Sequence, residues 1–271
     1  MVWQNTLIKN FLQTNMVIEF TKTFSPNFKG NPKEIISLII NFDTQGKSFD
    51  ERDRNSLKLF NIGDETINVK SFKVPHLINK IAYKFFRSSK AERSFTYAHK
   101  LLENGILTPA PIAYFEEETI LFGHSYYVSK HLKYDLTYRE LTTEGIYKGN
   151  KEILAAFAKF TYTLHNKGIH FLDHSPGNTL IVIKDDGYDF YLVDLNRMNF
   201  GSMDFETRMT NFERLSYNES DIAIMAKAYA KESGEDQEKV YKAICNATQS
   251  FQEKFHKKQQ LKKKLKFWKK A

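Results

Sequence analysis

The stretch that decides the fold is His170-Phe171-Leu172-Asp173-His174-Ser175-Pro176-Gly177-Asn178, followed by Tyr191-Leu192-Val193-Asp194-Leu195-Asn196-Arg197. It places an Asp and an Asn five residues apart in a Pro-Gly loop. Two short runs rich in strand-forming residues come next, Thr179 to Ile183 and Phe190 to Val193, separated by a polar segment that contains a glycine. This pattern predicts a β-hairpin. The hairpin is expected to bring Asn178 and Asp194 side by side, close to Asp173.

These three polar side chains suit phosphoryl transfer. Asn178 and Asp194 offer hard oxygen ligands, which Mg²⁺ prefers together with phosphate oxygens, and Asp173 can orient an attacking hydroxyl and accept its proton. A D-x-x-x-x-N loop followed by a hydrophobic strand and an Asp is typical of kinase-like phosphotransferases. Asp and Asn also favour turns in general, so the loop alone leaves open that both residues only cap a turn. The strand and Asp194 at this spacing favour the kinase interpretation.

Composition and charge narrow the classes of protein that fit. The 271 residues suffice for two lobes of ordinary size. No stretch approaches the roughly 18 to 20 apolar residues of a spanning helix, and the N-terminus lacks a basic start before an apolar run, so we expect neither secretion nor a membrane span. The single cysteine, Cys245, excludes an internal disulfide and a cysteine-built zinc site.

The net charge of +8 comes from one end of the chain. Residues 254–271 hold nine lysines and no acid, so the rest of the protein has a net charge of about −1. A nucleic-acid-binding domain is expected to carry a basic face within its fold. The charge distribution therefore argues against a specific nucleic-acid partner.

Upstream residues supply candidates for holding a nucleotide. Residues 42–73 alternate in short runs with glycine punctuation and predict a small antiparallel sheet. Ile67-Asn68-Val69-Lys70 has the order of the kinase strand whose lysine pairs with phosphates, with Lys73 as the alternative. There is no glycine-rich phosphate loop, and we expect the covering turn within residues 46–55, where Arg52, Arg54 and Asn55 offer donors to phosphate.

Two further helices frame the motif. Ser89-Lys90-Ala91-Glu92 predicts a helix start and Asn104-Gly105 its end. Glu92 is the candidate partner of the strand lysine, although an acid in the first turn also stabilises a helix by itself. Apolar residues at helical spacing from Ile153 to Leu164 predict a helix that leads into the loop of Asp173.

These motifs resemble those of the bacterial lipopolysaccharide kinases that phosphorylate Kdo or heptose sugars of the inner core. The resemblance spans about Lys70 to Arg197. It rests on the motifs Val69-Lys70-Ser71-Phe72, Ser89-Lys90-Ala91-Glu92-Arg93-Ser94-Phe95, Gly105-Ile106-Leu107-Thr108-Pro109-Ala110-Pro111, Gly168-Ile169-His170, Asp173 with Pro176-Gly177-Asn178, and Val193-Asp194-Leu195-Asn196-Arg197. The chain departs from the family pattern at Phe171, where a histidine commonly stands, and at Leu172, where many regulated protein kinases have Arg.

The resemblance implies roles for five residues and an architecture. Asp173 is the expected catalytic base, Asn178 and Asp194 the expected magnesium ligands, and Lys70 with Glu92 the expected pair that positions ATP. The implied fold is α+β and two-lobed, like a protein kinase, with a small, mainly antiparallel β N-lobe carrying one key helix and a mainly helical C-lobe. The expected boundaries are an N-lobe at 1–131, a C-lobe at 132–253 and a basic tail at 254–271.

The leading functional hypothesis is an ATP- and Mg²⁺-dependent kinase of a lipid-linked core saccharide. A phosphotransferase for a small alcohol, such as an aminoglycoside or choline, would share every catalytic residue. A nucleotide-binding pseudokinase or scaffold is the alternative from another class, and it is disfavoured because Asp173 and Asp194 are both present. The sequence leaves the sugar, its hydroxyl and the oligomeric state open.

The tail adds an expectation about location. Phe255, Leu261, Leu265 and Trp268 recur among its lysines and predict an amphipathic helix on an anionic membrane surface. A solvated, disordered basic end is the simpler alternative. With a lipid-linked acceptor, the protein is expected to be cytoplasmic and peripheral on the inner membrane of a Gram-negative bacterium.

Overall fold

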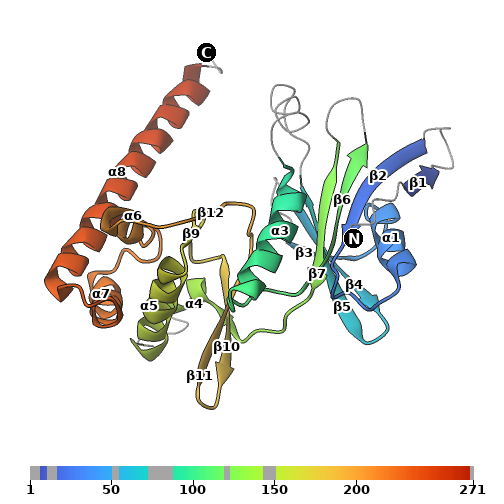
Figure 1. Cartoon of the computed structure of the whole chain (residues 1–271). Helices are drawn as coiled ribbons and strands as arrows, with labels where there is room; N and C mark the ends of the chain where they lie inside the picture. Colours follow the sequence, from blue (N-terminus) through green and yellow to red (C-terminus); the bar gives the residue numbers. More distant parts are fainter. Residues whose placement is uncertain are drawn as a thin grey trace. The chain divides into compact units, whose positions relative to one another are not determined.

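The chain divides into two compact units, which the computed structural model describes over residues 7–10, 17–50, 55–72, 88–118, 123–142 and 151–268. Unit 1 comprises Met1–Lys133 together with the short segment Asp194–Asn196. Unit 2 comprises Tyr134–Val193 and Arg197–Ala271. Figure 1 labels the helices and strands of both units.

Unit 1 is built on a seven-stranded sheet in the order β1-β2-β6-β7-β5-β4-β3, in which every neighbouring pair is antiparallel. The expected small sheet of residues 42–73 is therefore one edge of a larger one. The strands are β1 (Leu7–Asn10), β2 (Val17–Phe24), β3 (Lys47–Asp50), β4 (Asn55–Ile62), β5 (Glu65–Phe72), β6 (Pro111–Glu118) and β7 (Ser125–Lys130).

Two helices cover opposite faces of this sheet, α1 (Pro32–Ile40) and α3 (Lys90–Glu103). Ile35 and Ile39 of α1 pack in one core with Phe115 of β6. The adjacent Tyr114 meets Phe95 of α3, with 5.2 Å between ring centroids. Because consecutive strand residues point to opposite faces, the two contacts assign the two helices to different sides of the sheet.

Both helices begin at a polar residue whose side chain caps the first turn. The side chain of Asn31 accepts a hydrogen bond from the Lys33 amide at 3.0 Å, and Ser89 accepts one from the Glu92 amide at 2.9 Å. These caps satisfy amides that would otherwise lack a partner in the first turn. The predicted start of α3 at Ser89 is confirmed, and Asn31 caps α1 in the same way.

Strand register places Lys70 on the α3 face. Lys70 pairs with Tyr127, and Tyr127 pairs with Tyr114. Residues directly opposite in an antiparallel pair lie on the same face, so Lys70 shares the face of Tyr114. Its neighbour Val69 points the other way and is fully buried in the core with α1.

Unit 2 is mainly helical and carries two small sheets, ordered β11-β10-β8 and β12-β9. Its largest buried rings include Tyr138, Phe157, Phe212 and Tyr229. The helices are α4 (Tyr138–Thr142), α5 (Lys151–Asn166), α6 (Phe205–Thr210), α7 (Glu219–Ser233) and α8 (Gln237–Trp268); the strands are β8 (Leu136–Thr137), β9 (Ile169–Phe171), β10 (Thr179–Lys184), β11 (Gly187–Leu192) and β12 (Met198–Phe200).

The predicted hairpin is present with a tighter turn than the sequence suggested. Lys184 pairs with Gly187, so only Asp185 and Asp186 connect β10 to β11. The expected polar connection from Lys184 to Asp189 was too long, because its outer residues continue the strand pairing despite their polar side chains. The Val193 amide donates to the Asn178 carbonyl at 3.0 Å, which places the residue before Asp194 opposite Asn178.

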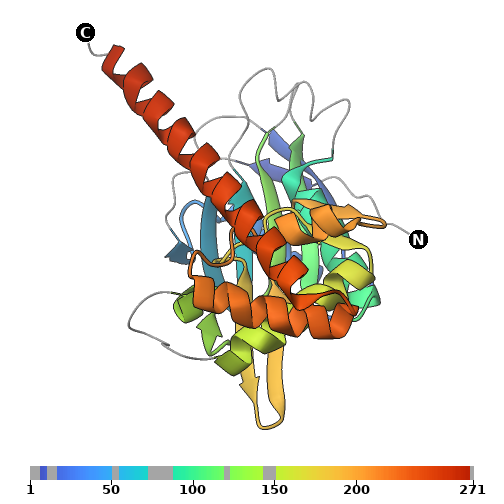
Figure 2. The same ribbon diagram turned by 90° about the vertical axis from the view of Figure 1, so that its left-hand side faces the viewer.

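Helix α8 continues well past Lys254, through most of the segment expected to form the basic tail. Its first part packs in the unit 2 core through Val240 and Ile244, whereas every residue of 253–263 is exposed. Figure 2 shows this helix in full along its length. The basic tail is thus a helix as far as Trp268, and the disordered alternative is wrong for this part of it.

Candidate functional site

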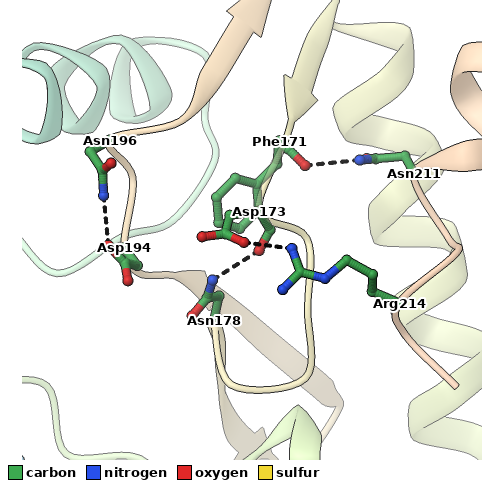
Figure 3. A network of polar contacts seen from close by, with 7 residues as sticks. All are labelled: Phe171, Asp173, Asn178, Asp194, Asn196, Asn211 and Arg214. Atoms are coloured by element: carbon green, nitrogen blue, oxygen red, sulfur yellow. Dashed lines mark hydrogen bonds and ion pairs between the residues drawn. The ribbon is translucent and has the colours of Figure 1, made fainter. Parts of the chain in front are cut away.

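Lys70 and Asp194 form an ion pair within unit 1. The Lys70 Nζ lies 2.8 Å from Asp194 Oδ1, and the two side chains are only 19% and 30% exposed. Asn196 Nδ2 donates to the same oxygen at 2.7 Å, as Figure 3 shows. Both contacts use one carboxylate oxygen, which leaves the other oxygen of Asp194 with no partner among the described residues.

Asp194 also has an unusual backbone conformation. Its φ is 61°, and no other non-glycine residue in the described part of the chain has a positive φ. Such a conformation costs of order 1 kcal/mol, although Asp tolerates it better than most residues. The strain is held by the two side-chain contacts, which orient the carboxylate toward Lys70.

In unit 2, the loop from Asp173 to Asn178 is closed by its own hydrogen bonds. Asn178 Nδ2 donates to the Asp173 backbone carbonyl at 2.8 Å, and the Asn178 amide donates to the Ser175 carbonyl at 2.9 Å. This hydrogen bond uses the side-chain nitrogen of Asn178 and leaves its side-chain oxygen available to bind a metal ion. The sequence placed these two residues in one loop, and the structure joins them directly (Figure 3).

The carboxylate of Asp173 is held by a residue that no sequence motif marks. Arg214 Nη1 lies 2.6 Å from Asp173 Oδ1, and the side chains are 33% and 20% exposed respectively. Arg214 follows α6, 41 residues after Asp173. No spacing or composition signal in the sequence distinguishes this arginine from others.

A buried polar chain supports the loop from behind. Asn211 Nδ2 donates to the carbonyl of Phe171 at 2.8 Å, and the Asn211 oxygen lies 3.1 Å from His165 Nε2. His165 Nδ1 lies 2.9 Å from the hydroxyl of Tyr229. Since the amide nitrogen of Asn211 already donates, its oxygen must accept from a protonated Nε2, and Nδ1 then accepts from the Tyr229 hydroxyl.

Two histidines in this region are held neutral. The pKa of His165 is lowered to about 4, mainly by burial; the Asn211 hydrogen bond opposes this shift and the nearby Arg208 adds to it. Burial lowers the pKa of His174 to about 3, with His165 as a smaller contribution in the same direction. The ring of His174 lies against Phe157 and Phe171, at centroid distances of 5.3 and 5.8 Å. Both rings are therefore uncharged at neutral pH.

Glu92 lies half-buried in the first turn of α3. It is close enough to Glu116 of β6 that its charge contributes, after burial, to raising the pKa of Glu116. Among the described residues, the ion-pair partner of Lys70 is Asp194 rather than Glu92. The pairing of Glu92 with Lys70 stays a prediction, and the alternatives Lys73, Arg52 and Arg54 lie outside the described residues.

Asn178 and Asp194 fit a magnesium ion by the chemistry of their donors. Each keeps one side-chain oxygen open, one an amide and the other a carboxylate, and Mg²⁺ commonly takes one or two such protein ligands together with phosphates and water. The described residues contain no group of three or more His, Cys, Asp or Glu side chains suited to a metal ion.

Comparisons with known proteins bear on the fold. No family model and no curated protein matches the chain. A solved structure described as WaaP in complex with acyl carrier protein is similar over 87% of this chain and 98% of its own, with a TM-score of 0.57 and 14% sequence identity. The expected α+β, kinase-like fold is confirmed, and the chain shares the fold of WaaP.

Proposed function

We propose that this protein is an ATP- and Mg²⁺-dependent kinase that phosphorylates a Kdo or heptose hydroxyl of the lipopolysaccharide inner core. The observation that carries the proposal is the loop in which Asn178 holds the backbone of Asp173 while its own oxygen stays open. The sequence motifs from Lys70 to Arg197 resemble those of the bacterial lipopolysaccharide kinases. The solved structure described as WaaP in complex with acyl carrier protein has the same fold.

In the proposed reaction, Asp173 acts on the acceptor. Its carboxylate takes the proton of the sugar hydroxyl as the hydroxyl oxygen forms a bond to the γ-phosphorus. The bond between the γ-phosphorus and the bridging oxygen breaks, and ADP leaves with that oxygen. Such transfers depend mainly on positioning and electrostatic stabilisation. This agrees with an Asp173 side chain that is only 20% exposed and is held by Arg214, and with a backbone carbonyl of Asp173 that accepts from Asn178.

Lys70, Asn178 and Asp194 are proposed to serve the nucleotide. Asn178 and Asp194 would hold magnesium, which neutralises charge on the phosphates when bound. Lys70 would contact the phosphates, and its present contact with Asp194 keeps its ammonium in place on the α3 face. Glu92, on the helix of the same face, is the proposed second partner of Lys70.

The acceptor is proposed to be lipid-linked because the protein carries a cationic helix. Phe255 and Leu261 of α8 are 49% and 60% exposed, in a segment where every residue of 253–263 is exposed. Their separation of six residues places them about 120° apart around a helix, so they do not form one narrow stripe. The side chains of Leu265 and Trp268 lie outside the described residues.

The proposal that the tail binds a membrane therefore rests more on its lysines than on an apolar stripe. Each lysine near an anionic surface contributes about 1 kcal/mol. Within the described part of the chain, no helix combines the length and apolar character needed to cross a bilayer. We propose peripheral binding at the cytoplasmic face of the inner membrane of a Gram-negative bacterium.

The direct test is phosphoryl transfer by the purified protein. Deacylated lipopolysaccharide from cells that lack this protein is incubated with Mg-ATP, and mass spectrometry should find a product heavier by one phosphoryl group. Asp173→Asn is the matched control and should form this product at least about a hundredfold more slowly. Transfer to an aminoglycoside or choline instead of the core saccharide would replace the proposed acceptor, and nucleotide binding without any transfer would favour a pseudokinase.

A further inference from the structure

The turn of residues 211–215, which follows α6, is fixed in unit 2 by buried side chains. Phe212 and Leu215 are fully buried in the main core of the unit. The Leu215 amide donates to the Phe212 carbonyl at 3.0 Å, and the Phe212 amide donates to the Met209 carbonyl at 3.1 Å. Arg214 lies between the two buried residues, so its backbone has little freedom.

This turn contacts the Asp173 loop at two points. Asn211 donates to the carbonyl of Phe171, two residues before Asp173, and Arg214 donates to the carboxylate of Asp173 itself. The first contact orients the backbone and the second orients the side chain. Figure 3 shows Asn211 and Arg214 reaching the loop from the same segment.

Helix α8 also contacts the side chain of Arg214. The Arg214 guanidinium carbon lies 5.8 Å from the centroid of the Phe251 ring. Phe251 in turn stacks on Phe255, with ring centroids 6.3 Å apart and planes inclined by 22°. A guanidinium on an aromatic face is held electrostatically, so its freedom to turn away from Asp173 is reduced.

We propose that Arg214, backed by Phe251, is a positioning residue that holds the carboxylate of Asp173 in the orientation needed to receive the acceptor proton. The inference rests on the proposed kinase function. An Asp side chain has two torsions, and a partly exposed carboxylate without a partner samples several of their wells. Arg214 restricts that sampling through a charge-assisted hydrogen bond, which is stronger than one between neutral groups.

The contacts predict which kinetic constant responds. Arg214 meets Asp173 and Phe251, whereas the residues proposed to hold ATP are others. Loss of Arg214 should therefore lower kcat and leave the KM for ATP nearly unchanged. A residue needed only for stability would reduce the amount of folded enzyme without changing the kinetic constants of the folded fraction.

The experiment measures transfer from Mg-ATP to deacylated lipopolysaccharide, and to water if the saccharide is not an acceptor. Arg214→Gln should lower kcat by about a hundredfold, the effect expected of a small misplacement of a reacting group, with the KM for ATP within about twofold. Arg214→Lys keeps the charge and should recover about tenfold of that loss. Phe251→Leu keeps an apolar side chain and should lower kcat only a few-fold.

A double variant separates positioning of Asp173 from any independent effect. Asp173→Asn with Arg214→Gln should transfer no more slowly than Asp173→Asn alone, because residues that act as a unit are not additive. Lys227→Gln removes an exposed cation from α7 and is the charge-matched control, which should leave kcat unchanged. Circular dichroism and thermal unfolding establish how much of each variant is folded.

Each outcome of these measurements supports or contradicts the positioning role of Arg214. Wild-type-like kcat in Arg214→Gln, or multiplied losses in the double variant, would overturn the positioning role while leaving the kinase function intact. A raised KM for ATP at unchanged kcat would also overturn it, since Arg214 would then serve the nucleotide. Absence of transfer to saccharide and to water by the wild-type protein would instead remove the proposed function, and the positioning role with it.

Discussion

Lowering the pH from about 7.5 to about 5 is expected to destabilise unit 2 through its two buried histidines, His165 and His174. In the folded protein their pKa values lie at about 4 and about 3, against an ordinary value of 6.5. Between these limits the unfolded chain binds protons that the folded chain does not. Stability is therefore fully present above about pH 6.5, and falls with decreasing pH until about 4 for His165 and about 3 for His174.

The size of the effect follows from the width of that window. About pH 5 lies roughly 1.5 units below the ordinary histidine pKa, and each unit corresponds to about 1.36 kcal/mol. Each histidine then lowers the free energy of unfolding by roughly 2 kcal/mol, or roughly 4 kcal/mol together. This loss is a large fraction of the stability of an ordinary domain, which is about 5 to 15 kcal/mol.

His174→Phe isolates one of the two contributions. The new ring would occupy the site between Phe157 and Phe171 and cannot bind a proton. Any packing cost acts equally at both pH values, whereas the decrease on acidification should shrink from roughly 4 to roughly 2 kcal/mol. Urea unfolding followed by far-UV circular dichroism measures both numbers, with the denaturant slope as a check on two-state behaviour.

His256→Gln is the matched control because His256 is exposed on α8. It should reproduce the wild-type dependence on pH. An undiminished acid-induced loss in His174→Phe would refute the reasoning, since the buried ring would then not be the group that resists protonation. A loss that shrinks equally in His256→Gln would show that the measurement does not report the buried site.

Three further predictions concern the proposed chemistry. Asp173→Asn should preserve the fold and ATP affinity but slow transfer by at least about a hundredfold, measured on purified enzyme, and near-normal rates would exclude Asp173 as the base. Asp194→Ala should abolish Mg²⁺-dependent nucleotide binding, whereas Lys70→Met should only weaken it; unchanged Mg-ATP titrations of Asp194→Ala would show that another residue holds the metal. Deletion of residues 254–271 should release the protein from anionic vesicles at low salt yet spare transfer to a soluble acceptor, and equal co-sedimentation of both forms would contradict a membrane role for the tail.

Sequence reasoning succeeded where a signal and its effect lie within a few residues. The caps at Asn31 and Ser89 each accept from an amide two or three positions on. The loop of Asp173 and Asn178 is closed by a hydrogen bond across five residues. Because these groups are close along the chain, a local turn is enough to bring them into contact.

The order of the strands needed the tertiary structure. Strand β7 lies between β6 and β5, and β6 pairs with β2 on its other side. The apolar pattern of a strand indicates which of its faces is buried but not which strand lies beside it, so several orders are compatible with the same sequence. The observed strand order is the one that buries the apolar residues of the sheet against both α1 and α3.

The sequence by itself determined the fold class, the starts of the helices, and a loop and hairpin that carry Asp173 and Asn178. Only the tertiary structure decided which distant groups meet them: Arg214 at Asp173, Asn211 behind Phe171, and Lys70 at Asp194. Capping and turn formation are driven by local hydrogen bonds, whose partners are given by residue spacing. An ion pair across 41 residues forms because core packing around Phe212 and Leu215 carries the arginine there, and packing is a property of the whole chain.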